Sequence, residues 1–371
     1  MVSTRKVELF QGVLSFLAAF LFTNGIFDLA YNRQIGDYEY IDNLWEMTRN
    51  DLNINFNKSS MRDEFFFTLE PWKVMNNIKN GVFCPYTTQK DLIKIVVMIK
   101  SAAEYKARRD IVRQTWGRIS HIDNVVIDVV FIIGSTTKDV QQKIETEHSK
   151  HGDILQFIGV DDYRHIVYKV LSGMQWAKEN LPKDYFYATG DDDLTLDVKV
   201  LPRHLRRHMR YVLERLPREK ANNRLKQIQQ MPILCVYNYL NEAKPIRNLI
   251  SKYYLDPKEY LMDTLPPFCL GGWYMMPVVS AAKLYDVSRK EKVLPMDDVW
   301  ITGILRQKIK PKFIEPIDSS SARVISREVK IVQHFFGDTD FATAEDILRL
   351  TISHWEKLEA GIAEHKHCLR K

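Results

Sequence analysis

Three consecutive acids, Asp191, Asp192 and Asp193, follow an apolar and aromatic run that begins at Tyr185. The run predicts a short buried strand, and the acids would then stand at the carboxyl end of a sheet, where open α/β folds bind ligands. Adjacent carboxylates repel one another unless they are protonated, solvated or neutralised by a cation. Hard oxygen ligands suit Mg²⁺ or Mn²⁺, and Mg²⁺ is often shared with substrate phosphates. The triplet therefore indicates either a divalent metal holding a diphosphate or a solvated acidic turn.

A second pair of acids, Asp297 and Asp298, stands before an apolar run that can form a helix. Either acid can cap the amino end of that helix. Alternatively, one of them can act as a general base, which must reach the hydroxyl that it deprotonates within hydrogen-bond distance. The residues alone leave both interpretations open.

Two arginines, Arg109 and Arg113, are four positions apart and share one face of a predicted helix. Guanidinium groups placed in this way can hold a phosphate or pair with acids of the same fold. His334 lies in a late apolar strand, where a histidine is usually structural, although neutral imidazole also suits Mn²⁺. The paired glycines Gly271 and Gly272 permit either a plain turn or a close approach of backbone to ligand.

Alternating elements are expected to position these residues. Apolar, β-branched runs predict strands, and polar or amphipathic segments between them predict helices. The predicted strands are residues 92–100, 125–134, 153–158 and 185–191, and the predicted helices between them are 136–150 and 163–178. Such alternation is typical of an α/β layer with a mainly parallel sheet.

The charge of the chain narrows the classes of partner. The 371 residues carry a net charge of +6, a mild basic excess that suits anionic sugar nucleotides or a membrane surface. No RNA- or DNA-binding motif accompanies the charge, so we expect no nucleic-acid partner.

The cysteines are far apart with no CxxC pair, which argues against zinc. Cys84, Cys235, Cys269 and Cys368 fit either one or two disulfides in an oxidising compartment or four buried thiols.

The first 84 residues predict a membrane anchor and a stem. Residues 9–27 carry no charge, and Arg5 and Lys6 precede them. The length and the flanking charges predict an uncleaved transmembrane signal anchor, with a cleaved signal peptide as the alternative. Residues 1–8 would then form a cytosolic tail and residues 28–84 a lumenal stem, in which Asn57 begins a glycosylation sequon. Residues 85–371 would form the lumenal domain.

Several segments, in order between Leu92 and Cys368, resemble the β1,3-glycosyltransferases of family 31, which include galactosyl-, N-acetylglucosaminyl- and fringe-type enzymes. The segments are Arg109-x-x-x-Arg113-x-Thr115-Trp116-Gly117, Asp153-Ile154-Leu155 with Asp161-x-Tyr163 and Lys169, the acidic triplet, Pro266 to Tyr274, and Asp297-Asp298-Val299.

The resemblance implies a GT-A domain, a Rossmann-like α/β fold that binds a nucleotide sugar. It implies an inverting, metal-dependent enzyme that moves a hexose, with galactose expected, from a UDP-sugar to a glycan hydroxyl in β1,3 linkage. The alternatives are transfer of N-acetylglucosamine or N-acetylgalactosamine, and a lectin-like or scaffolding member without catalysis. The glycan acceptor would be a glycoprotein or glycolipid, and the enzyme would be a type II protein of the Golgi membrane.

The resemblance also implies roles for individual residues of this sequence. Asp298 is the expected general base, and Asp191, Asp193 and His334 are expected to hold Mn²⁺ or Mg²⁺. The expected donor-binding residues are Arg109, Arg113, Lys169 and Asp192, and the expected pocket for donor and acceptor is formed by Gly271, Gly272, Trp273 and Asp297.

Four departures from the family pattern stand beside these matches. Thr189 replaces a lysine two residues before the triplet, His165-Ile166-Val167 replaces Asn-Leu-Thr, and Leu181 stands about where a cysteine is common. Gly303 comes one residue later than the glycine of the Glu/Asp-Asp-Val-x-x-Gly motif.

Overall fold

The computed structural model divides the chain into two units, residues 1–61 and 62–371, and every described residue belongs to the second. The described residues are 64–81, 84–86, 92–217, 223–235, 238–239, 243–249, 251–309, 314–316, 332–334 and 344–370. The predicted anchor, most of the predicted stem and Asn57 lie outside these ranges. Within the ranges, no helix combines the length and the apolar character needed to span a membrane.

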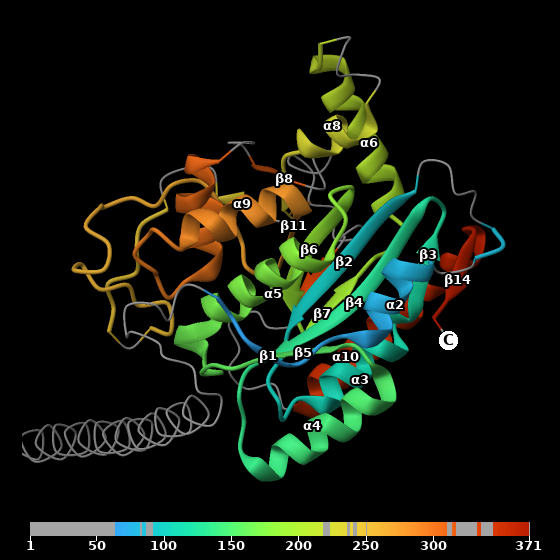
Figure 1. Cartoon of the computed structure of the whole chain (residues 1–371), viewed down its shortest axis with the longest axis horizontal. Coiled ribbons are helices and arrows are strands. Elements are labelled where there is room, and N and C mark those ends of the chain that lie inside the picture. Colours follow the sequence, from blue (N-terminus) through green and yellow to red (C-terminus); the bar gives the residue numbers. More distant parts are fainter. Residues whose placement is uncertain are drawn as a thin grey trace, which may run out of the picture. The chain divides into compact units, whose positions relative to one another are not determined.

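A ten-stranded mixed sheet forms the centre of this unit (Figure 1). Its strands are β1 (Phe67–Leu69), β2 (Ile93–Lys100), β3 (Ile119–Ile122), β4 (Val125–Ile133), β5 (Ile154–Phe157), β6 (Tyr185–Asp191), β8 (Ile233–Cys235), β11 (Trp273–Pro277), β12 (Ile314–Pro316) and β14 (His367–Leu369). The order along the sheet is β1-β5-β4-β2-β6-β11-β8-β12, and β3 joins β4 to β14.

The predicted α/β layer is confirmed at the centre of the sheet, where β5, β4, β2 and β6 are parallel. All four strands were expected from their apolar runs. The edges differ from the mainly parallel sheet that we expected, because β1, β3, β11 and β14 pair in antiparallel fashion. Two smaller sheets pair β9 (Asn238–Tyr239) with β10 (Phe268–Cys269), and β7 (Leu194–Leu196) with β13 (Val332–His334).

Helices cover both faces of the sheet. The α-helices are α2 (Trp72–Asn80), α3 (Lys106–Gln114), α4 (Lys138–His151), α5 (Ile166–Asn180), α6 (Leu201–Arg215), α8 (Arg224–Gln229), α9 (Val278–Ser288) and α10 (Ala344–Glu359). Short 3₁₀ turns are Trp116–Arg118, Tyr163–His165, Leu305–Lys308 and Ile362–Glu364, and a π-helix spans Asp298–Ile304. The predicted helices 136–150 and 163–178 correspond to α4 and to the 3₁₀ turn followed by α5.

The core has two layers because successive side chains of a strand point to opposite faces. In β2, Val96 and Met98 pack toward α5 and α9, whereas Val97 and Ile99 pack with side chains from α3, α4, α6 and α10. Burial on both faces explains why β2 and β4 read as continuous apolar runs. Figure 1 shows α5 and α9 side by side on one side of the sheet.

Two disulfides use all four cysteines. Cys84 pairs with Cys368 on β14, and Cys235 on β8 pairs with Cys269 on β10. Their Cα–Cα distances of 5.9 and 5.4 Å are ordinary for a disulfide. The structure thus selects the disulfide interpretation and supplies a pairing that the sequence left open.

Candidate active site

Strands β2 and β6 bring a lysine beside the first acid of the triplet. The two strands are parallel neighbours, and their register places Lys100 opposite Asp191. Paired residues of adjacent strands project from the same face of a sheet, so their side chains meet. Lys100 Nζ lies 3.0 Å from Asp191 Oδ1.

The same ammonium group reaches two further segments. Lys100 Nζ lies 3.2 Å from Asp297 Oδ2 and donates a hydrogen bond of 3.1 Å to the carbonyl oxygen of Gly271. Burial alone would lower the pKa of Lys100, but the nearby charges of Asp191 and Asp297 outweigh it and raise the pKa above its ordinary value. One buried cation therefore joins the end of β6, the loop before β11 and the start of the π-helix.

Asp298 has the environment of a general base. Its Oδ2 accepts a hydrogen bond of 3.0 Å from Gly271 N, and its Oδ1 accepts one of 2.7 Å from Val299 N. Burial, reinforced by the charge of Asp297, raises the pKa of Asp298 to about 7, although Lys100 and the two amides act in the opposite direction. A carboxylate with a pKa near neutrality accepts a proton more readily than an ordinary aspartate does.

The π-helix accounts for the late position of Gly303. Thr302 Oγ1 donates to the carbonyl oxygen of Asp298 at 2.6 Å and accepts from Cys269 N at 2.8 Å. A Cβ atom on Gly303 would lie only 3.2 Å from Phe268 Cβ. A π-helical turn holds one residue more than an α-helical turn, so Thr302 and Gly303 can both meet the β10 segment.

Asp192 belongs to a network of loops at this edge of the sheet. It is buried, accepts a hydrogen bond of 2.7 Å from Ser101 Oγ and pairs with Arg108 at 3.1 Å. Burial raises the pKa of Asp192 to about 6, although the hydrogen bond from Ser101 and the charge of Arg108 lower it. Lys169 donates to Ser101 O at 2.6 Å and pairs with Asp161 at 2.5 Å. These contacts hold the loops that follow β2, β5 and β6 together.

The guanidinium group of Arg109 uses all of its hydrogen-bond donors within the protein. It is fully buried and all five of its N–H groups are used: two toward the Glu147 carboxylate at 2.8 and 2.7 Å, and the others toward Ser101, Ala102 and Ala103. It has no donor left for a phosphate. Of the two roles that the sequence left open for this arginine, the geometry supports bracing of the fold.

Arg113 braces the same region. It makes a bidentate pair with Asp153, two bonds of 2.8 Å, and lies 2.7 Å from Glu147. These acids, together with hydrogen bonding, outweigh burial and raise the pKa of the Arg113 guanidinium above its ordinary range. The motif Arg-x-x-x-Arg thus holds α3 against α4 and the start of β5.

The residues expected to hold a metal have chemistry that fits one. Asp191 and Asp193 are both partly exposed at the end of β6. Strand β13 pairs with β7 so that the backbone of His334 lies opposite Leu194, one residue from Asp193. Among the described side chains, no group of three acids, histidines or cysteines converges on a metal position, and the His334 side chain is not described. Carboxylate and imidazole groups are both suitable ligand types for Mn²⁺.

The glycine segment contributes backbone to the site. Gly271 presents both its N–H to Asp298 and its carbonyl to Lys100. A Cβ atom on Gly190 would lie 3.1 Å from Gly272 O and 2.5 Å from Leu194 Cδ2, so β6 needs a glycine there. Trp273 is 1% exposed, and its ring packs in the core layer on the face opposite Lys100. Its side chain therefore does not join Lys100 and Asp297 in the site.

Sequence reasoning missed Lys100, Ser101, Arg108 and Thr302. The signal for Lys100 was a lysine at the end of an otherwise apolar buried strand, which needs an acidic partner. The other three side chains carried no comparable signal, because their partners lie in distant segments.

We expect Arg109→Met to lower the free energy of unfolding by about 3–5 kcal/mol, because it leaves the Glu147 carboxylate buried without its main partner. The double variant Arg109→Met/Glu147→Leu should recover part of that loss. Urea denaturation measures both. A single variant as stable as the wild type would argue against the bracing role.

Comparison with known proteins places this geometry in a family. The family model "Galactosyltransferase" matches residues 107–316. Drosophila melanogaster beta-1,3-galactosyltransferase brn is 29% identical over 215 residues, which cover 58% of this chain and 60% of that protein. Human beta-1,3-galactosyltransferase 5 is 27% identical over 208 residues, or 56% of this chain and 61% of that protein.

N-acetylglucosaminyltransferases are also among the relatives. Danio rerio lactosylceramide 1,3-N-acetyl-beta-D-glucosaminyltransferase A is 25% identical over 273 residues, which cover 71% of this chain and 64% of that protein. In each case the matched region spans less than two thirds of the relative's length. The apo structure of mouse xyloside xylosyltransferase 1 matches 60% of this chain and 84% of that chain at 12% identity, but its TM-score of 0.28 supports no argument about the fold. The family match and the relatives together show that this chain belongs to the galactosyltransferase family, alongside β1,3-galactosyltransferases and β1,3-N-acetylglucosaminyltransferases.

Proposed function

We propose that the chain is an inverting β1,3-glycosyltransferase of the GT-A type that transfers a hexose from a UDP-sugar to a glycan hydroxyl. Galactose is the first candidate for that hexose. The observation that carries the proposal is the buried Asp298 carboxylate, whose pKa lies near 7 and which Gly271 and Lys100 join to the acidic triplet. Galactosyltransferases among the relatives support galactose, and the N-acetylglucosaminyltransferases leave that sugar as the second candidate.

Asp298 would act on the acceptor. Its carboxylate removes the proton from the acceptor hydroxyl as that oxygen attacks the anomeric carbon of the donor. The bond from that carbon to the UDP oxygen breaks, its electron pair leaves with UDP, and the configuration inverts. Gly271 N and Val299 N fix the orientation of the base, and Lys100 holds Asp297 beside it.

Asp191 and Asp193, with His334, would hold Mn²⁺ or Mg²⁺. When bound, the metal supplies positive charge that stabilises the departing diphosphate. Lys100 and Arg108, which contact Asp191 and Asp192, add positive charge at the same edge of the sheet.

The proposed location is the Golgi lumen, with the chain anchored as a type II membrane protein through residues 9–27. Two disulfides support an oxidising compartment.

The primary test of the proposed function is UDP release by residues 62–371. The donors are UDP-galactose, UDP-N-acetylglucosamine and UDP-N-acetylgalactosamine, each in manganese or EDTA and over a panel of acceptor sugars. The proposal is supported if one of the donors gives UDP release that requires both metal and an acceptor sugar. Binding of UDP without release for any donor would contradict it.

The first variant tests the base. Asp298→Asn should reduce transfer to background while UDP binding is retained, because the amide cannot accept the proton of the acceptor. UDP release and UDP titration calorimetry measure the two properties. Asp286→Asn, an exposed site on α9, is the matched control and should transfer normally. Normal turnover by Asp298→Asn would remove Asp298 from this role.

The pH profile tests the environment of the base. Because the base form of Asp298 increases as pH rises through about 7, kcat/KM for the acceptor should rise over the same range. Lys100 lowers the pKa of Asp298, so Lys100→Met should move this limb to higher pH. Lys94→Met, at the amino end of the same strand, is the control and should leave the profile in place. A Lys100→Met profile that coincides with the wild type would contradict the coupling.

The metal assignment has its own test. Asp193→Ala should weaken UDP binding in manganese at least about tenfold and make it insensitive to EDTA, because a carboxylate ligand is lost. Asp184→Ala, just before the amino end of β6, is the control and should bind as the wild type does. Equal UDP binding by the wild type with and without metal would contradict the assignment.

A further inference from the structure

Two exposed tyrosines meet near the proposed base, outside the residues that the mechanism uses. Tyr163 begins the 3₁₀ turn Tyr163–His165, which follows β5 at the carboxyl edge of the sheet. The start of that loop is fixed, because Asp161 pairs with Lys169 at 2.5 Å and accepts a hydrogen bond of 2.8 Å from Gly134 N. Within the turn, Asp162 accepts a hydrogen bond of 3.0 Å from His165 N. Tyr163 therefore stands on a braced turn at the same edge as the acidic triplet.

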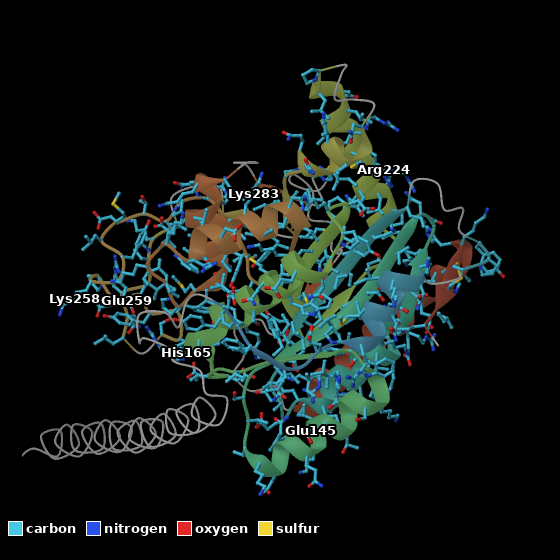
Figure 2. All side chains as sticks on the ribbon, viewed as in Figure 1. Glu145, His165, Arg224, Lys258, Glu259 and Lys283 are labelled. Carbon is cyan, nitrogen blue, oxygen red and sulfur yellow. A yellow bond between two sulfur atoms is a disulfide. The ribbon has the colours of Figure 1, made fainter. Side chains whose placement is uncertain are left out.

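The second tyrosine comes from a segment far along the chain. The ring centroids of Tyr163 and Tyr253 are 6.2 Å apart with an interplanar angle of 70°. Lys252 Nζ lies 5.9 Å from the centroid of the Tyr163 ring and 5.1 Å from that of Tyr253. An ion pair of 3.5 Å between Arg164 and Glu259 joins the two segments, and Figure 2 labels one residue on each, His165 and Glu259.

The segment that carries Tyr253 is itself held in shape. Arg247 donates to the carbonyl oxygens of Leu255 at 2.6 Å and Tyr260 at 2.7 Å. Ser251 Oγ accepts a hydrogen bond of 3.2 Å from Tyr253 N. These contacts keep the two rings in place without covering them, since Tyr163 is 47% exposed and Tyr253 is 43% exposed.

Electrostatics relate this cluster to the base. Desolvation is the main cause that raises the pKa of the Tyr163 phenol above its ordinary range, and Tyr253, Asp297 and Asp298 raise it further. The charges of Asp297 and Asp298 act on this phenol only because it lies within electrostatic reach of them. The turn that carries Tyr163 is also tied to the triplet, because Lys169 pairs with Asp161 and donates to Ser101 O, and Ser101 Oγ donates to Asp192. A molecule resting on the two rings would thus lie at the same edge of the sheet as the triplet.

We propose that Tyr163, Lys252 and Tyr253, named here the tyrosine platform, bind the pyranose ring of the acceptor glycan; this inference rests on the proposed function. The face of an aromatic ring is electron-rich and attracts the C–H groups that line one side of a hexopyranose. Two rings at a steep angle present a corner for one sugar ring, and the ammonium and phenol groups can bond its hydroxyls. The acceptor is accordingly a sugar that presents an apolar face to the rings.

Acceptor kinetics test the platform. Tyr163→Ala and Tyr253→Ala should each raise the acceptor KM about tenfold, the effect of losing one stacking contact of about 1.4 kcal/mol. The probes are the p-nitrophenyl β-glycosides of galactose, N-acetylglucosamine and N-acetylgalactosamine. The donor KM, and the slow UDP release to water without acceptor, should stay at wild-type values. Tyr253→Trp, which keeps an aromatic face, should retain an acceptor KM near that of the wild type.

A matched control separates stacking from a general effect of removing tyrosine. Tyr86 is 60% exposed and lies beside Cys84, which is bonded to β14 away from the triplet. Tyr86→Ala should leave both KM values unchanged. An unchanged acceptor KM in Tyr253→Ala, or an equal rise in Tyr86→Ala, would overturn the proposal.

A binding measurement keeps the platform testable apart from catalysis. Saturation-transfer NMR with the three methyl β-glycosides, in UDP and manganese, should show ring-proton signals with the wild type that Tyr253→Ala loses. If the wild type binds a glycoside in this way but never transfers sugar, the proposed function fails while the platform stands. If transfer is normal and glycoside signals persist in Tyr253→Ala, the platform fails while the function stands. Absence of glycoside binding by the wild type would also overturn the platform.

Discussion

The buried ammonium group of Lys100 is the interaction on which the site depends. It lies between two carboxylates, Asp191 and Asp297, and it also bonds the Gly271 carbonyl. Without a cation there, two acids would face each other at the end of a buried sheet, which is electrostatically costly. The same contact links the strand that ends in the triplet to the segments that position the base. The acidic triplet and the segment that carries Asp298 are thereby held at a fixed separation.

Local sequence patterns were sufficient to predict the central strands and the acids at the end of β6. The apolar run before the triplet is a strand because β-branched and aromatic residues fill both core layers around it. Asp298 was singled out by the resemblance to the family motif, because the residues alone left a helix cap and a general base as equal interpretations. These features depend on residues that are close together in the sequence.

The remaining features depend on contacts between distant segments. Lys100 and Asp297 are 197 positions apart, and no local pattern brings them together. The five protein contacts of Arg109 could not be foreseen either, since Glu147 lies on another helix and the carbonyls come from a loop. Spacing alone could not separate an arginine that binds phosphate from one that braces the fold. Trp273 shows the same limit, because alternation along β11 turns its ring into the opposite core layer.

The raised pKa of Asp298 has a cost in stability. Its ordinary value is 3.8, and burial beside Asp297 raises it to about 7 in the folded protein. The folded protein therefore keeps a proton that the unfolded chain releases between these values, so this group's contribution to stability falls as pH rises from about 4 to about 7. The base form of Asp298 therefore predominates at the pH where this group contributes least to the stability of the fold.

The π-helix has a consequence for how positions are matched between chains. Counted back from Gly303 with the family spacing, the base position would fall on Val299, whose side chain cannot accept a proton. Loss of one residue between Asp298 and Gly303 would restore α-helical spacing, but Thr302 and Gly303 could no longer both meet the β10 segment. The extra residue and the Thr302 hydroxyl therefore act together, because the π-helical turn lets that hydroxyl bond both the backbone carbonyl of Asp298 and the amide of Cys269.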